Sequence, residues 1–272
     1  VTVRGRTVVA EVTSAGLFDP VATVEATLPT GLEAGPVALL ARDTAADVDD
    51  VTAARLHTPE TTRAPTPVAG PLDPGASDEF DNGLGTGWSW VRDPVATAAG
   101  GALTFPVHAA DLSGQRNDAS LLLRDAPSGD WIAETRVRMP LGDAEPPAFP
   151  QAGLLVYASD DHYLRLSSMG HGALRETAYQ KEMPYAGSLV NNAGYAGAAG
   201  EVTWLRLHHR IDPVDGEHEV RAGTSRDGTN WTWAAVLTLP ADADLRIGIG
   251  AHGAGPDDEF TATFDYFRVY RG

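Results

Sequence analysis

The sequence alternates apolar and polar residues at period two over many short segments, and this pattern limits the chain to antiparallel β-structure. Clear examples are QAGLLVYASDDHYLRLSS, VTWLRLHHRID and EHEVRAGTSRDG. Such alternation places apolar side chains on one face of a strand and polar side chains on the other. No segment of ten residues or more shows the spacing of an amphipathic helix. We therefore expect an all-β protein.

Turn residues divide the second part of the chain into eleven predicted strands. Many short strands joined by Asp-Gly, Asn-Gly and Pro turns favour a sandwich or jelly roll over a parallel α/β fold. For residues 179–200 the pattern predicts a loop. The predicted strands are 102–107, 120–124, 131–138, 152–158, 162–167, 174–179, 202–210, 218–225, 231–239, 245–251 and 260–270.

A Pro-rich stretch, TPETTRAPTPVAGPLDPGAS, predicts a linker at residues 58–77. Proline removes backbone donors and restricts its neighbour, so the stretch favours extended chain. It separates residues 1–57 from a larger domain at 78–272. The smaller part is too short to bury both faces of a sheet, and its 35–56 segment aligns with 245–271. Its expected packing partner is the larger domain, another chain or a removed upstream portion.

Composition excludes several classes of function. The formal charge of -17 and the pI near 4.7 disfavour nucleic acid as a partner, because phosphates would be repelled. The 272 residues contain no cysteine, which excludes disulfides and thiolate chemistry, and no apolar run long enough to predict a membrane span. The chain begins at Val1 without the charged and apolar regions of a leader, so we expect a mature or trimmed product, compatible with secretion.

Polar and aromatic residues on the predicted strands suggest a ligand groove. Tyr163 and Arg165 lie opposite Leu164 and Leu166 in the alternation, and a second strand repeats the arrangement. Aromatic faces stack on sugar rings, whereas Arg, Gln and Glu bond hydroxyl groups. The alternative is a solvated face with ordinary ion pairs. The predicted substrate-binding residues are Gln151, Arg165, Glu176, Tyr179, Trp204, Arg206 and His208, with His171 nearby.

Six segments occur in an order that resembles a known superfamily. They are SDEFDNGLGTGWSWVRDP, GALTFPV, LLLRDAPSGDWIAETRV, QAGLLVYASDDHYLRL, SRDGTNWTW and FDYFRVYR. From 78 to 271 the chain resembles concanavalin A-like (laminin G-like) jelly rolls, above all the C-terminal module of family 43 β-xylosidases and related accessory domains of secreted bacterial sugar enzymes. The resemblance implies two antiparallel sheets of six or seven strands. It also implies glycan binding, or completion of a neighbouring catalytic pocket.

The resemblance extends to the first 57 residues, which are similar to the closing strands of a second sandwich. The five-bladed propeller that carries catalysis in the xylosidases has no counterpart in this sequence. The resemblance therefore implies the accessory part of such an enzyme, with the activity elsewhere.

A structural calcium ion is also implied by the resemblance. In the similar jelly rolls the first and last strands lie side by side near such an ion, and the matching residues are Asp78, Glu79 and Asp265. Calcium prefers several oxygen ligands, which carboxylates and free carbonyls supply. The alternative is that Asp78 and Asp81 cap a turn and that Asp265 pairs with an arginine.

Catalytic motifs are not recognised in the sequence. Glycoside hydrolysis normally uses two carboxyl groups across the scissile bond, and the Glu-x-Asp-x-(x)-Glu strand of jelly-roll glucanases is absent. The strongest candidate for an unfamiliar acid/base set is Glu176 with His171 or Tyr179, and Glu182 is a second carboxylate on the same predicted face.

The sequence thus predicts a carbohydrate-binding or accessory module of a secreted bacterial glycoside hydrolase that acts on plant or microbial polysaccharide. Its expected partners are a polysaccharide or oligosaccharide and a glycosidase catalytic domain or chain. Two alternatives stay open. One is a hydrolase of xylan or arabinan, or a lyase, with a non-standard active site in the groove; the other is a structural docking module.

Overall fold

A computed structural model describes residues 1–12, 22–31, 38, 42, 51–53, 66–114, 116–142, 144–146, 148–185 and 188–272. It divides the chain into two units, Val1–Ala64 and Pro65–Gly272. The smaller unit contains an antiparallel sheet of β1 (Thr2–Arg4), β2 (Thr7–Val12) and β3 (Ala22–Thr27). Most of the 35–56 segment, whose similarity to 245–271 suggested a second sandwich, lies outside the described residues.

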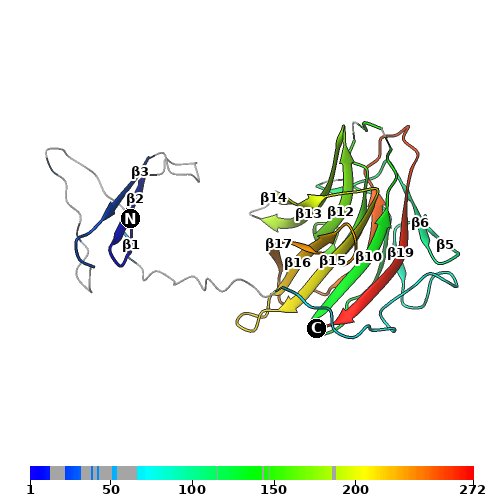
Figure 1. Cartoon of the computed structure of the whole chain (residues 1–272), viewed down its shortest axis with the longest axis horizontal. Helices are drawn as coiled ribbons and strands as arrows, with labels where there is room; N and C mark the ends of the chain where they lie inside the picture. The colour runs from blue at the N-terminus through cyan, green and yellow to red at the C-terminus, as the bar shows by residue number, and fades with distance from the viewer. Residues whose placement is uncertain are drawn as a thin grey trace. The chain divides into compact units, whose positions relative to one another are not determined.

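The larger unit consists of two seven-stranded antiparallel sheets, and β19 runs beside β10 in the first of them (Figure 1). The prediction of an all-β jelly-roll sandwich is therefore confirmed. In spatial order, the β17–β5 sheet comprises β17 (Thr232–Leu239), β16 (His218–Ser225), β15 (Val202–Ile211), β10 (Trp131–Arg138), β19 (Phe260–Arg271), β6 (Leu103–Val107) and β5 (Thr97–Ala98). The β14–β4 sheet comprises β14 (Ser188–Ala198), β13 (Leu174–Tyr185), β12 (His162–His171), β11 (Gln151–Ser159), β18 (Arg246–His252), β9 (Leu121–Asp125) and β4 (Ser89–Val91). The described residues contain no helix that could cross a membrane.

The main core lies between the two sheets and follows the period-two pattern. On β15, Leu205 and Leu207 are buried, while the alternate residues Trp204, Arg206 and His208 are partly exposed. Leu164 and Leu166 of β12 enter the same core from the other sheet. Because successive side chains point to opposite faces, the alternate residues of both sheets face outward, on opposite sides of the sandwich.

A small hairpin covers part of the outer face of the β14–β4 sheet. It is formed by β7 (Leu112–Ser113) and β8 (Arg116–Asn117), and Leu112 packs in a second apolar cluster with Tyr163. The Tyr163 hydroxyl donates to the Leu112 carbonyl. The buried Glu182 carboxylate accepts hydrogen bonds from the Gly114 backbone N–H at 2.9 Å and from the Asn191 amide at 3.1 Å. These contacts fix the hairpin on the sheet.

The predicted loop at 179–200 is wrong, because β13 continues to Tyr185 and returns as β14. The missed strand reads SLVNNAGYAGA and lies at the edge of its sheet. An edge strand with small and polar residues has no alternation to detect, since much of it faces solvent on both sides.

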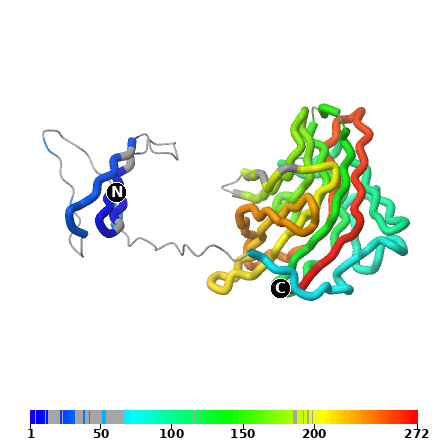
Figure 2. Tube along the Cα trace, in the orientation of Figure 1, coloured from blue at the N-terminus to red at the C-terminus, as the bar shows by residue number. Residues whose placement is uncertain are grey.

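The predicted linker also extends too far toward the larger domain. Residues 70–78 run along β19, where Asp73 N–H donates to the Val269 carbonyl at 2.7 Å and Arg271 N–H donates to the Pro71 carbonyl at 2.9 Å. In Figure 2 this cyan segment passes beside the C-terminus. Proline lacks a donor but keeps its carbonyl acceptor, so a Pro-rich stretch can still pair through its acceptors.

Two truncations test this boundary. Deletion of residues 1–64 is expected to leave a single cooperative unfolding transition, because both seven-stranded sheets are retained. Deletion of residues 1–76 removes three backbone hydrogen bonds to β19, from Gly70 and Asp73 and to Pro71. It should lower the free energy of unfolding by about 3 kcal/mol more, at about 1 kcal/mol for each bond. Urea unfolding followed by circular dichroism compares the two; equal stability would contradict the assignment.

Candidate functional site

A groove of about 510 Å³ lies on the outer face of the β14–β4 sheet. This volume falls in the range of small-ligand sites. The strand register explains why polar residues meet there: Met169 of β12 is paired with both Gln151 and Glu176, and Arg165 is paired with Gln180. The principal lining side chains are Asp111, Phe149, Gln151, Arg165, Met169, His171, Glu176 and Gln180. Four predicted residues, Gln151, Arg165, His171 and Glu176, are thus brought together.

An aromatic pair lies at one end of the groove. Phe149 is 49% exposed and stacks on His171, with ring centroids 4.2 Å apart and an interplanar angle of 16°. The His171 Nδ1 atom is buried and has no hydrogen-bond partner among the described residues. An exposed ring supported from behind offers an apolar face to a ligand.

Glu176 lies close to this pair and is half-buried. In the part of the chain that the structure describes, its carboxylate accepts no hydrogen bond and joins no ion pair. Burial raises the pKa of Glu176, and the nearby His171 partly offsets that rise. A carboxylate without a protein donor can accept hydrogen bonds from a ligand.

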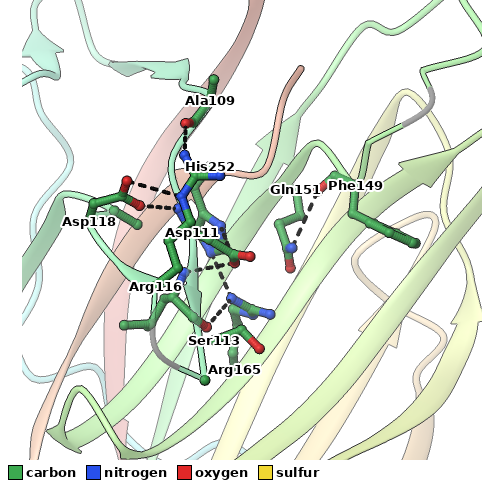
Figure 3. A network of polar contacts seen from close by, with 12 residues as sticks. Ala109, Asp111, Ser113, Arg116, Asp118, Phe149, Gln151, Arg165 and His252 are labelled. Carbon is green, nitrogen blue, oxygen red and sulfur yellow. Dashed lines mark hydrogen bonds and ion pairs between the residues drawn. The ribbon is translucent and has the colours of Figure 1, made fainter. Parts of the chain in front are cut away.

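Arg165 forms the floor of the groove and is only 3% exposed. Its Nε donates to the Gln180 Oε1 at 3.1 Å, and its Nη1 donates to the Leu112 carbonyl at 3.3 Å. Nη1 also lies 2.7 Å from His252 Nε2. Burial and the Arg165 charge lower the pKa of His252, so the ring is neutral and its Nε2 accepts from Arg165. Figure 3 shows Arg165 and His252 together with the neighbouring polar residues Asp111, Arg116 and Asp118. Gln151 and Phe149 lie beside this network.

Gln151 carries an unused acceptor at the same place. Its Nε2 donates to the Phe149 carbonyl at 3.3 Å, whereas its buried Oε1 has no partner among the described residues. A buried polar atom without a partner is costly, and a bound ligand or water can supply the missing bond. The groove therefore offers acceptors on Gln151 and Glu176, donors on Arg165 and Gln180, and an aromatic face, a combination suited to a polyhydroxylated ligand.

Tyr179 does not belong to the groove. It is 3% exposed in the main core, and its hydroxyl donates to the Val220 carbonyl at 2.8 Å. Glu176 and Gln180 occupy even positions of β13 and Tyr179 an odd one, so its side chain points to the opposite face. The sequence prediction that placed it beside Glu176 is wrong for this reason.

Trp204, Arg206 and His208 share a face as predicted, but it is the outer face of the other sheet. They lie on β15, opposite the core residues Leu205 and Leu207, and so on the far side of the sandwich from the groove. The Arg136 guanidinium lies 5.1 Å from the Trp204 ring centroid, and Arg206 pairs with Glu134 at 2.5 Å. His208 contacts Trp233 edge to face. The predicted single site is thus divided between two surfaces, and the second contains internal pairs.

The residues predicted to bind calcium already have protein partners. Both Asp78 oxygens accept hydrogen bonds, Oδ1 from Phe80 N–H at 2.9 Å and Oδ2 from the Trp88 indole at 2.7 Å. Glu79 pairs with Arg268 at 2.7 Å.

Asp265, the third predicted ligand, pairs with Arg136. Among the described residues no group of three acidic or histidine side chains is arranged to hold an ion. As they stand, Asp78, Glu79 and Asp265 do not fit a shared calcium shell, because each would have to exchange a donor or a cation for the ion. The presence of calcium in this protein stays an untested prediction.

Several groove residues were not predicted from the sequence. Gln180 lies four residues after Glu176 on the same strand and therefore shares its face. It was missed because the predicted strand ended at residue 179. Phe149 precedes β11 and Asp111 precedes β7, so no periodicity could place them.

The fold and the groove define this unit as a concanavalin A-like β-sandwich with a ligand-sized groove on one sheet. Residues 77–270 match the family model of the β-xylosidase C-terminal concanavalin A-like domain, and the chain belongs to that family. The resemblance of residues 78–271 to this C-terminal module is thereby confirmed. No curated protein matches the sequence.

Solved structures share the fold at low sequence identity. A variant of the GH43 protein BlXynB from Bacillus licheniformis is 21% identical with a TM-score of 0.57, covering 77% of this chain and 42% of that one. Xylan β-1,4-xylosidase from Bacillus halodurans C-125 is 18% identical, with a TM-score of 0.56 and coverages of 78% and 41%. This chain thus spans about two fifths of the length of these two proteins.

A protein of unknown function from Saccharomyces cerevisiae is 17% identical, with a TM-score of 0.54. The match covers 69% of this chain and 97% of the yeast chain.

Replacement of Asp78 by Ala tests the role of its contacts. Loss of the carboxylate leaves the Phe80 amide, the Gly85 amide and the Trp88 indole without their acceptor, so the free energy of unfolding should fall by about 3 kcal/mol, at about 1 kcal/mol for each bond. Because the predicted calcium ligands already have partners, EDTA should leave the melting temperature of the unaltered protein unchanged. Thermal unfolding with EDTA and with added calcium measures both effects; a clear decrease in EDTA would support the calcium prediction instead.

Proposed function

We propose that this domain binds an oligosaccharide in the groove of the β14–β4 sheet and acts as the accessory module of a glycoside hydrolase. The proposal rests on the position of unpaired polar groups beside the exposed Phe149 ring. Glu176 and the Gln151 Oε1 atom lack donors in the described structure, and Phe149 lies beside them. Neutral hydroxyl groups satisfy such acceptors, and the C–H face of a sugar ring covers the aromatic side chain.

Membership of the β-xylosidase C-terminal family supports the connection to sugar-active enzymes. One similar protein is named as a xylan β-1,4-xylosidase, which supports a plant polysaccharide as the source of the ligand. This chain covers only 42% and 41% of the two similar enzymes. The remainder of those enzymes supports a catalytic partner for this domain, in the same protein or in another chain. Secretion from a bacterium is part of the same proposal, since intact polysaccharide is degraded outside the cell.

Single substitutions on the two faces of the sandwich test where the glycan binds. Phe149→Ala removes an exposed stacking ring and should weaken binding about fivefold to tenfold. Trp204→Ala removes an aromatic ring on the opposite outer face and should leave the affinity unchanged. Titration calorimetry with a series of xylo-oligosaccharides measures both. The reverse result would place the site on the β17–β5 sheet.

Glu176→Gln gives a second test, with a readout that a purely structural role would not change. Protonation of Glu176 removes acceptor capacity, and because its pKa is raised this loss begins at a higher pH than for an ordinary glutamate. The affinity of the unaltered protein should therefore fall as the pH is lowered through this raised pKa. Glu176→Gln should bind about tenfold more weakly at neutral pH and lack that pH dependence. An identical pH profile in both proteins would exclude Glu176 from the site.

A hydrolase active site in the same groove is the second candidate function. The observation that favours it is the raised pKa of Glu176 beside His171, since a carboxyl group with a raised pKa can act as a general acid. Asp111 is a second carboxyl group in the groove lining. A reducing-sugar assay on xylan and arabinan decides between the functions: the proposed accessory role predicts binding without turnover. Turnover that Glu176→Gln abolishes would establish the enzyme.

A further inference from the structure

Among the residues that the structure describes, the buried Arg165 guanidinium has no carboxylate partner. Of its five N–H groups, Nε and one on Nη2 donate to Gln180, and the two on Nη1 are directed at the Leu112 carbonyl and His252 Nε2. All of these acceptors are neutral. Within the described residues no carboxylate oxygen lies within 4 Å of its nitrogens, whereas many other arginines of the unit form such pairs. One Nη2 hydrogen is left over.

The position of this cation is set by the sheet. Arg165 lines the groove at 3% exposure, and it extends along the floor toward the β11–β18 pair, where His252 is paired with Gln151. Its guanidinium therefore points toward the strand pair that carries Gln151, whose buried Oε1 has no partner among the described residues. Asp111 and Glu182 act on Arg165 only at longer range.

Burial of a charge without a counter-ion is costly, so this arrangement gains most from a ligand that brings a negative charge. Gln151 lines the same groove, and its buried Oε1, which has no partner among the described residues, requires a donor that a hydroxyl group provides. Carboxylate and hydroxyl groups occur together on one ring in a uronic acid. Farther along the groove, Phe149 and Glu176 present the aromatic face and acceptor suited to a neutral sugar.

We propose that the groove recognises an acidic oligosaccharide, with the carboxylate of a uronic acid residue on Arg165, a hydroxyl of that residue on Gln151, and an adjoining neutral sugar on Phe149. This inference rests on the proposed glycan binding and specifies its ligand.

The test uses the unaltered full chain and two matched ligands: a xylo-oligosaccharide with one glucuronic acid branch, and the same compound after reduction of its carboxyl group to the alcohol. Calorimetry should give at least tenfold tighter binding of the acidic form, because hydrogen bonds to a charged partner are the stronger ones. Equal affinity for the two compounds would overturn this inference and leave the glycan-binding proposal intact. Failure of both compounds to bind would overturn both.

Variants locate the charge recognition. Arg165→Gln should remove most of the preference for the acidic ligand, while thermal unfolding reports whether the variant is folded. Arg138→Gln is the matched control, because Arg138 is an exposed arginine of the other sheet, paired with Glu201. It should keep the preference. If Arg165→Gln does not fold, the carboxyl-reduced ligand and the salt dependence of wild-type binding still decide, since charge recognition weakens with added salt. A preference that survives in folded Arg165→Gln would place the carboxylate elsewhere and overturn the assignment to Arg165.

Discussion

The groove depends on the register between β11, β12 and β13. A shift of one residue would turn every side chain of a strand to the other face, so the apolar set of these strands must stay on the core for Gln151, Arg165 and Glu176 to face outward together. Leu154, Leu164 and Leu166 provide that anchor because they are fully buried between the sheets. The polar site is thus held in place by apolar packing on the reverse side of the same strands.

The β7–β8 hairpin gives the outer face its shape. A seven-stranded sheet alone would present an open surface, but Leu112 and Tyr163 pack the hairpin against it and Glu182 fixes Gly114. Arg165 connects the two parts, because it donates to the Leu112 carbonyl of the hairpin and to Gln180 of the sheet. A cation that also supports the wall of the groove is rigidly positioned, which favours selective recognition of a ligand.

The opposite face shows why aromatic and arginine residues alone do not identify a site. Trp204, Arg206 and His208 have the composition expected of a sugar-binding surface, yet Arg206 is neutralised by Glu134 and stacks on Trp231. Glu176 and Gln151 have a less suggestive composition, but the Glu176 carboxylate and the Gln151 Oε1 atom have no hydrogen-bond partner among the described residues. Arg206 therefore has its charge paired, whereas Glu176 and Gln151 keep free acceptors within the described residues. Whether a side chain is paired depends on neighbours that are distant in the sequence.

Local sequence patterns were enough to predict the all-β class, the positions of most long strands and, with the exception of Tyr179, the face on which the candidate residues of the recognised strands lie. These properties follow from local alternation and turn chemistry, which require no knowledge of distant contacts. The sequence also predicted four groove residues, Gln151, Arg165, His171 and Glu176, although it combined them with residues of another surface. Which faces meet became known from the folded structure. Period two separates the two sides of one strand but does not say which outward faces of different strands adjoin. The folded structure likewise revealed the edge strand β14 and the contributions of Phe149 and Asp111 from loops. It also showed that no carboxylate among the described residues pairs with Arg165. Each of these features arises from contacts between segments far apart in the chain.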